Sequence, residues 1–441
     1  MRARPSIAIL AGLLGLAGIT TAQNLPEAPN VEALEPPHLS TRLVAARISR
    51  LVVGFDQAME PSTNVLDVRQ AAALRVFRTQ WVDARTFVAD VELAPDRVYA
   101  LDLGVAFGLR AKSGATLRPV PWRFATSGER LADDVAATAA QRLFTVLRDH
   151  YSYRDRIGVD WNEIEQQRTE ALRGAVDAPA FALLAADLLG AAQDPHITVR
   201  WQDCSLPTYR RAVVVNFDRR GILRTFPRLE RIGRDGLAAR SDDGVGYLFV
   251  PTFAREERDD FDRLLQTLRG MLDCKALVLD LRTNEGGDET LARRLAAFFV
   301  PDEVAFARHR VRDPKAEGGF RSVEIRTLRG NGPPDTFRGP VAVLMGQANM
   351  ASAEDFLLMM KQAPQAFLVG GDSYGSSGNP QPHTLLPGLV VQVPSWQALR
   401  PDGAQLEGHG VSPHLHVDAR AEQLIDDDPV LAAALGRLRK R

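Results

Sequence analysis

A serine within a turn of small residues is the side chain in this sequence that is best placed for chemistry. Ser352 lies in the segment NMASAED, residues 349–355, after an apolar run that ends at Met345. At the start of a helix, free backbone N–H groups and the helix dipole can stabilise an oxyanion, so Ser352 could act as a nucleophile. Ser352 with Asp355 three residues later also matches a capping box, and on this segment alone the cap is the favoured interpretation.

A serine nucleophile needs a base and a third group that orients the base. The candidates lie in three other segments: His196 in DPHIT (194–198), Glu407 in EGHGVSP (407–413), and the paired Gly286 and Gly287 in DLRTNEGG (280–287). Paired glycines let the backbone approach another group closely and can point N–H donors at it. Each segment alone also has an ordinary explanation, as a structural histidine, a turn and a strand-to-helix connection. The spacing alone does not bring these residues together.

A basic cluster follows the glycine pair. Arg308, Arg310, Arg312 and Lys315 could hold a peptide carboxylate through charge-assisted hydrogen bonds. A solvated hairpin is the favoured alternative. Two cysteines without neighbouring histidines or further cysteines do not suggest a zinc site.

The elements that must position these residues alternate between strand and helix. From residue 246 onward, the apolar runs 278–281 and 340–345 are typical of buried strands, whereas 289–299 and 352–362 have helical patterns. This alternation indicates an α/β core.

The preceding part of the chain has a different organisation. Short runs with alternating apolar and polar residues between 40 and 128 predict a β-sandwich with its own core, and the helical period of 131–192 predicts a cap. The expected divisions are a flexible Pro-rich leader (23–39), the sandwich (40–128), a helical cap carrying His196 (130–204), a connecting segment (205–244), the catalytic core (245–425) and a C-terminal helix or tail (426–441).

The N-terminus predicts export. Residues 1–22 combine Arg2 and Arg4, an apolar stretch and the small residues 20–22, which is typical of a cleaved signal peptide, with an uncleaved anchor as the alternative. We therefore expect a periplasmic or secreted protein, and no later stretch predicts a membrane span. In such a compartment Cys204 and Cys274 could pair, although the sequence does not show that they are close. The net charge of −1 predicts no attraction to nucleic acid.

Residues 130–425 resemble peptidase family S41, which includes C-terminal-processing proteases and the tricorn core. Several motifs occur in the order of the family: GYLFVPTF (246–253) is similar to "GYL-x-I-P-x-F", 280–287 to "DLR-x-N-x-GG", 351–354 to "(A/S)-S-A-(A/S)-E", GGDSYGSSG (370–378) to "G-x-x-(T/S)-x-G", and 407–413 to "E-x-x-G-V-x-P-D". Each motif alone is weak, but their common order is a strong signal.

The resemblance implies specific roles. One catalytic style of the family uses a lysine where this chain has Ser376, so that base is missing. The other, tricorn-like style uses a histidine in a "D-G-H-T"-like segment, which His196 fits. Ser352 would then be the nucleophile and His196 the general base. Glu407 would orient the imidazole and raise its pKa.

The same resemblance implies an oxyanion hole formed by backbone N–H groups of Gly286 or Gly287 and of Ala353. Three positions depart from the family pattern: Pro195 stands where the tricorn style has a serine, Glu285 where glycine or proline is usual, and His414 where aspartate is usual. A relay between His196 and Glu407 would therefore be direct or use another hydroxyl, such as that of Thr198.

We expect a multidomain α+β protein with an Ig-like β-sandwich, a helical cap and a ClpP/crotonase-like α/β core. The sandwich resembles bacterial Ig-like modules, through VGFDQAM (53–59) and FAT (124–126), and would act as a spacer or docking module. The implied function is a serine peptidase that acts on peptides or proteins through an acyl-enzyme, without metal or organic cofactor. An inactive peptide- or ligand-binding protein and an esterase with the same triad are the alternatives. The sequence does not determine the oligomeric state.

Overall fold

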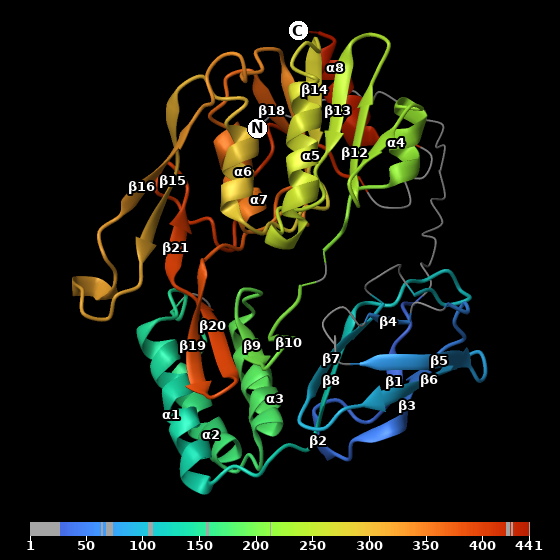
Figure 1. Ribbon diagram of the computed structural model, residues 1–441, viewed down its shortest axis with the longest axis vertical. Helices are drawn as coiled ribbons and strands as arrows, with labels where there is room; N and C mark the ends of the chain where they lie inside the picture. The colour runs from blue at the N-terminus through green and yellow to red at the C-terminus, as the bar shows by residue number, and fades with distance from the viewer. Residues whose placement is uncertain are drawn as a thin grey trace, which may run out of the picture.

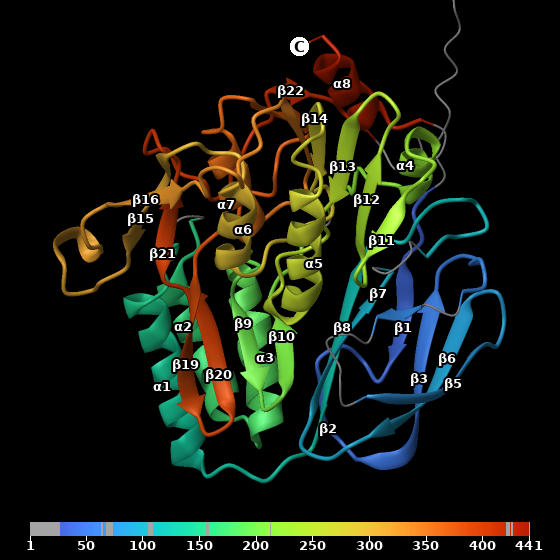
Figure 2. The same cartoon turned by 45° about the horizontal axis from the view of Figure 1, so that its top comes forward.

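The computed structural model describes residues 27–440 except 63–64, 68–73, 105–108, 156–157, 212, 420–423 and 425–426. The expected signal peptide therefore lies outside the described residues. Three bodies lie side by side (Figures 1 and 2): a β-rich body, a mixed body that carries α1 to α3, and a large α/β core. In the described part of the chain, every helix is too short or too polar to cross a membrane.

The β-rich body consists of two four-stranded sheets. In spatial order they are β1 (Val31–Glu35), β3 (Ala46–Phe55), β6 (Thr86–Leu93) and β5 (Arg75–Trp81), and then β2 (Ser40–Leu43), β8 (Val120–Thr126), β7 (Val98–Leu103) and β4 (Leu66–Asp67). Residues of both sheets, such as Val53 and Trp122, share one apolar core. The leader is not wholly flexible as predicted, because β1 forms within it and pairs antiparallel with β3.

The second face of this body is also buried. Val98, Ala100 and Ala125 pack with residues of α3 (Ala178–Leu189) and β10 (Cys204–Pro207) in one apolar cluster. The indole N–H of Trp201 donates to the backbone oxygen of Asp96 at 3.0 Å. The sandwich therefore has its own core, as expected, but it also completes the core of the neighbouring body.

The mixed body differs from the predicted helical cap. It contains α1 (Asp133–Asp149), α2 (Trp161–Arg173) and α3, together with the sheet β10, β9 (Thr198–Trp201), β20 (Leu389–Pro394) and β19 (Pro380–Leu386). Residues 380–394, which lie within the predicted core range 245–425, form two strands of this sheet, and β20 pairs antiparallel with β9. Leu389, Val391 and Val393 give these strands an apolar face that packs in the same cluster as α1 and α3.

The predicted α/β core is confirmed. Its sheet has the order β11 (Glu230–Ile232), β12 (Gly236–Arg240), β13 (Val245–Phe249), β14 (Ala276–Asp280), β17 (Val341–Met345), β18 (Ala366–Gly370) and β22 (Leu415–His416), and it is parallel from β13 onward. The helices α5 (Arg258–Arg269), α6 (Glu289–Ala296) and α7 (Ser352–Met360) cover one face, and α4 (Arg219–Thr225) and α8 (Pro429–Leu438) cover the other. Neighbouring residues of β14 alternate between the two layers, with Leu277 and Leu279 on one side and Val278 on the other.

A small sheet and three short 3₁₀ turns complete the described elements. The sheet consists of β16 (Glu324–Arg329), β15 (Glu303–Val311) and β21 (Trp396–Leu399), and the turns are Gly190–Ala192, Arg255–Glu257 and Glu317–Gly319. Cys204 and Cys274 belong to different bodies; both are buried and neither forms a disulfide. The pairing that the sequence left open is therefore not formed, and burial raises the pKa of the Cys204 thiol to about 11.

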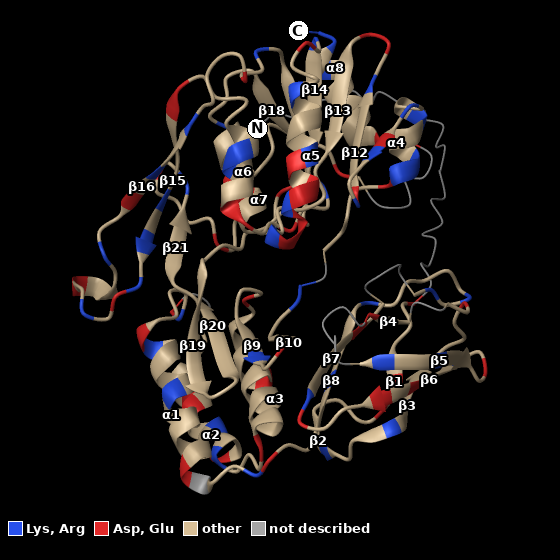
Figure 3. Cartoon of the chain, viewed as in Figure 1, with Lys and Arg blue, Asp and Glu red and all other residues tan. Residues whose placement is uncertain are grey.

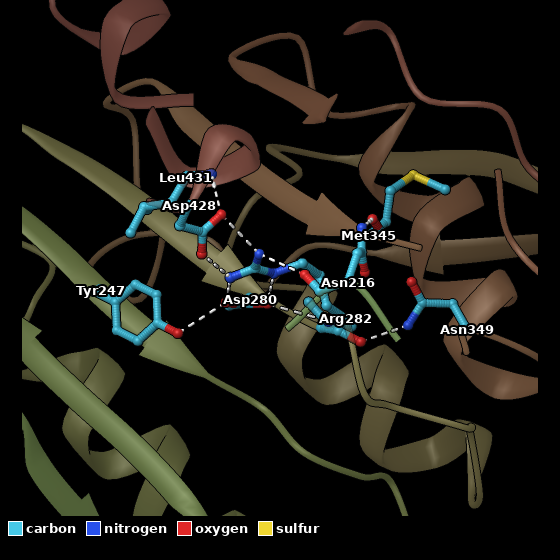
Figure 4. A network of polar contacts seen from close by, with 9 residues as sticks. Asn216, Tyr247, Asp280, Arg282, Met345, Asn349, Asp428 and Leu431 are labelled. Atoms are coloured by element: carbon cyan, nitrogen blue, oxygen red, sulfur yellow. Dashed lines mark hydrogen bonds and ion pairs between the residues drawn. The ribbon is translucent and has the colours of Figure 1, made fainter. Parts of the chain in front are cut away.

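A buried ion network fixes the loop that leaves β14 (Figure 4). The fully buried guanidinium of Arg282 lies 2.7 Å from a carboxylate oxygen of Asp280 and 2.9 Å from one of Asp428. It also donates to the backbone oxygen of Asn216 at 2.8 Å, and the hydroxyl of Tyr247 donates to Asp280 at 2.8 Å. The DLR motif therefore joins β14 to α8 and to the segment before α4.

Asp428→Asn tests this network. Asparagine can still cap α8, as Asp428 does through Leu431 N, but it leaves Arg282 with a single carboxylate in a buried site. Breaking a buried pair in this way costs about 3–5 kcal/mol of unfolding free energy. Urea unfolding measures the loss. Arg439→Gln, which breaks an exposed pair with Asp243, should leave the midpoint close to wild type, and equal effects of the two changes would contradict the analysis.

Candidate active site

The candidate nucleophile lies in a strained turn between β17 and α7. Ala351 has φ 51° and ψ −124°, an unfavourable conformation for a residue with a side chain. Ser352 is the first residue of α7 and is only 7% exposed. Its hydroxyl donates to the carbonyl oxygen of Gly287 at 2.7 Å. The capping-box alternative is wrong, because Ala351 occupies the cap position and no side chain caps this helix.

The glycine pair brings the second loop against this turn. Gly286 and Gly287 have φ values of 94° and 136°, which side chains disfavour. A Cβ at Gly286 would lie 2.6 Å from Met350 O, and one at Gly287 would lie 2.3 Å from the carbonyl group of Phe253. Phe253 N also donates to Gly286 O at 3.0 Å. Glycine is therefore required at both positions for the loop to approach Ser352.

The predicted oxyanion donors differ in availability. The N–H of Gly286 donates to the side chain of Asn284 at 2.9 Å, and the N–H of Ala353 donates to Met350 O at 3.0 Å. Among the residues that the structure describes, the N–H of Gly287 donates to no protein acceptor. Gly287 is therefore the most accessible donor of the three.

His196 is held just before β9 by a buried carboxylate. Asp194 accepts a hydrogen bond from His196 N at 2.9 Å and another from the hydroxyl of Tyr151 at 3.0 Å. The imidazole Nδ1 lies 2.9 Å from the hydroxyl oxygen of Ser376. Burial lowers the pKa of His196, and Asp194 opposes this only in part. The neutral form of the imidazole is therefore favoured, and the expectation of a raised pKa was wrong.

Glu407 contributes to the site through the backbone. One of its carboxylate oxygens accepts a hydrogen bond from Ser377 N at 2.8 Å. The Nδ1 atom of His196 contacts the hydroxyl of Ser376, the residue before Ser377, rather than the carboxylate of Glu407. Thr198, the other hydroxyl considered, donates to Gln392 at 2.8 Å instead.

One segment connects all of these parts. Ser376 contacts His196 through its hydroxyl, and its carbonyl oxygen accepts a hydrogen bond from Ala351 N at 2.8 Å. Glu354, fully buried on α7, accepts hydrogen bonds from Gly375 N at 2.8 Å, from Ser376 N at 2.9 Å and from the Ser373 hydroxyl. Residues 373–377 therefore bring the turn of Ser352, His196 and Glu407 together.

The basic cluster lies along β15 and the loop that follows it, a region where Figure 3 shows basic residues in blue. Arg310 donates to the side chain of Gln397 at 2.8 Å, and the guanidinium groups of Arg310 and Arg312 lie 4.5 and 5.2 Å from the ring centre of Phe320. In the described part of the chain, neither Arg308 nor Arg310 forms a hydrogen bond or ion pair with Ser352. These contacts favour the hairpin interpretation, and substrate binding by Arg308 and Arg310 stays a prediction.

Sequence reasoning missed three residues of the site. Asp194 and Glu354 lie in motifs in which only a neighbouring residue, His196 or Ser352, was given a role. Ser376 was noticed only as the position of a missing lysine. The signal available for Ser376 was its place in a glycine- and serine-rich segment, but its partner is 180 residues away in the sequence.

Comparison with known proteins identifies the core. Residues 244–417 match the model of peptidase family S41. A candidate peptidase from Parabacteroides merdae ATCC 43184 has a similar structure, with a TM-score of 0.59, 19% identity, and coverage of 69% of this chain and 96% of that one. Mature CPAF is similar with a TM-score of 0.51, 12% identity, and coverage of 69% and 96%. At these identities the two structures support the fold alone.

The matched region, residues 244–417, contains the strained serine turn and the parallel strands of the three-layer core, and it supports a peptidase of family S41. The Ig-like identity of the sandwich stays a prediction.

Gly287→Ala tests the close approach of the two loops. The strained φ costs on the order of 1–3 kcal/mol, and the Cβ contact with Phe253 must displace the loop. We expect a lower melting temperature and roughly a hundredfold slower reaction of Ser352 with a fluorophosphonate probe. Gly371→Ala is the matched control, because its Cβ would have no neighbour within 4 Å. Unchanged labelling of the Gly287 variant would contradict the assignment.

Proposed function

We propose that this chain hydrolyses peptide bonds through an acyl-enzyme on Ser352, with His196 as the general base. The observation that carries the proposal is the double contact of Ser376, whose hydroxyl meets His196 Nδ1 while its carbonyl holds Ala351, the residue before Ser352. A single residue thus ties the turn of the nucleophile to the candidate base. The match to peptidase family S41 supports a peptide or protein substrate.

The chemistry follows from the neutral imidazole. With Nδ1 directed at Ser376, Nε2 is the nitrogen that can accept the Ser352 proton. Attack forms a bond between Ser352 Oγ and the scissile carbonyl carbon, and the proton then passes from Nε2 to the departing amine. Water hydrolyses the acyl-enzyme by the same proton route. Before attack, the hydroxyl of Ser352 must turn from Gly287 O toward the imidazole.

The developing oxyanion needs N–H donors beside Ser352. We assign this role to Gly287, whose N–H is accessible, together with Ala353 once it gives up its bond to Met350. Glu407 supports the site by holding Ser377, and through it the neighbouring Ser376. The β-rich body would serve as a spacer or docking module. The expected location of the protein remains the periplasm or the external medium.

A non-catalytic peptide-binding protein on the same fold is the second candidate. One observation favours it: the hydroxyl of Ser352 is engaged by a backbone carbonyl rather than by a base. An esterase with the same residues is a further alternative. Comparison of peptide and ester hydrolysis separates the esterase from the peptidase, and failure of Ser352 to react with a fluorophosphonate would favour the binding protein.

Ser352→Ala should fold normally and lose at least about a thousandfold in kcat/KM on peptides, since removal of a nucleophile eliminates nearly all turnover. The loss of a hydrogen bond to Gly287 should change the melting temperature only slightly. Ser322→Ala, at an exposed serine, is the control. Hydrolysis that persists in the purified Ser352 variant would place the nucleophile elsewhere.

His196→Ala should lower kcat/KM by a factor of about 10²–10⁴, the usual contribution of general base catalysis. Because burial depresses the pKa of His196, its ring signal in NMR spectra should titrate below the ordinary value of about 6.5. The stability that the neutral ring contributes is then present above that value and is lost as the pH falls through the folded-state pKa.

Glu407→Gln should cause a smaller loss of activity than His196→Ala, because it weakens only the support of Ser377. If His196→Ala retains the wild-type rate, the base is another histidine. His383, which packs on His150 at 4.5 Å between ring centres, and His409 would be the next candidates.

A further inference from the structure

A buried acid beside the nucleophile has no role in the mechanism above. Glu354 is the third residue of α7 and is fully buried. Its carboxylate accepts three hydrogen bonds, from Gly375 N, Ser376 N and the Ser373 hydroxyl. In the described part of the chain it pairs with no Lys, Arg or His side chain. A buried carboxylate without a cation is costly, and burial raises the pKa of Glu354 to about 7.

The partners of Glu354 all belong to one short segment. Of these residues, Ser376 makes the two contacts that matter to the reaction, one with His196 Nδ1 and one with Ala351 N. The backbone N–H of Ser376 points to Glu354 while its side chain and carbonyl point to the base and to the nucleophile turn. Glu354 therefore holds a residue that contacts both the candidate base and the turn of the nucleophile.

The neighbouring acid on α7 has a different role. Asp355 stands three residues after Ser352. It accepts from Arg326 on β16 at 3.0 Å and has no bond to residues 373–377 among the described contacts. The two buried acids are thus adjacent in sequence but anchor different parts of the molecule.

We propose that Glu354 is a positioning residue that couples the nucleophile to the base. By accepting hydrogen bonds from Ser373, Gly375 and Ser376, it holds Ser376 where the hydroxyl meets His196 and the carbonyl meets Ala351. This proposal rests on the proposed function, because it assigns the supporting group of that same site.

Glu354→Gln is the direct test. The amide keeps the shape of the side chain, but its NH₂ group replaces one of the carboxylate oxygens that accept from Gly375 N and Ser376 N. A donor then faces a donor, so residues 373–377 must shift. A displacement of about 1 Å can cost a hundredfold in rate. We expect kcat to fall by about that factor, with KM within about threefold of wild type, because substrate contacts are untouched. An unchanged kcat, or a loss confined to KM, overturns the proposal.

Asp355→Asn is the matched control, since it also alters a buried acid of α7. It should lower the melting temperature through the loss of its pair with Arg326 and leave kcat near wild type. If both variants lose kcat in proportion to stability, Glu354 is only a structural acid and the proposal fails.

The NMR signal of His196 gives a readout that needs no substrate. The signal is assigned among the eight histidines by its loss in His196→Ala. Glu354→Gln should shift this signal and its pKa, and Asp355→Asn should not. A wild-type protein without hydrolytic activity would contradict the proposed function, but the signal would still decide the positioning role. An unmoved signal in the Glu354 variant overturns it.

A double-mutant cycle shows the route of the effect. If Glu354 acts through Ser376, the kcat losses of Glu354→Gln and Ser376→Ala should be markedly less than multiplicative when combined. Multiplicative losses would mean that Glu354 acts by another route. Should Glu354→Gln fail to fold, Ser373→Ala removes one partner and keeps the carboxylate. It should shift the His196 signal in the same direction as Ser376→Ala, and an unmoved signal again overturns the proposal.

Discussion

The contact between the Ser376 hydroxyl and His196 Nδ1 joins the α/β core to the mixed body. The nucleophile belongs to the three-layer core, whereas the candidate base precedes a strand of the mixed body. A hydrogen bond of this kind orients an imidazole only if both sides are rigid. A buried acid fixes each side: Asp194 accepts a hydrogen bond from His196 N, and Glu354 accepts one from Ser376 N. The site therefore depends on a junction between bodies rather than on either body alone.

Buried polar groups are concentrated around this junction because backbone there cannot be satisfied by regular sheets or helices. The loop after β14 is held by Arg282 and its two carboxylates, and its glycines then reach the turn of Ser352. Asn349 completes the connection by donating to the backbone oxygen of Asn284 at 3.0 Å. Most residues of these motifs thus hold loops in place, and only a few of them are candidate reacting groups.

The alternation of buried strands and helices made the α/β core predictable, since its central strands, such as β14 and β17, are buried along their whole length. Ser352 and His196 could be proposed from motifs that occur in a common order. The pairing of β20 with β9 could not, because it joins residues nearly two hundred positions apart and a period-2 pattern does not name its partner. The predicted direction of the His196 pKa shift was also wrong. Burial of the ring lowers the pKa more than the Asp194 carboxylate raises it, and a local motif does not reveal how deeply a residue is buried. The strand in the leader was hidden by its prolines, which flank β1 without interrupting it.

Because β19 and β20 pair with β9 in the mixed body, the parts of the protein must fold in a particular order. Synthesis proceeds from the N-terminus, and domains generally fold as they emerge. The sheet around β9 cannot close until residue 394 is available, and Glu407 follows later still. His196 is therefore made early but acquires its fixed surroundings late. A nascent chain remains without an assembled site until residue 407 has been made, which would delay any proteolytic activity until these bodies are folded.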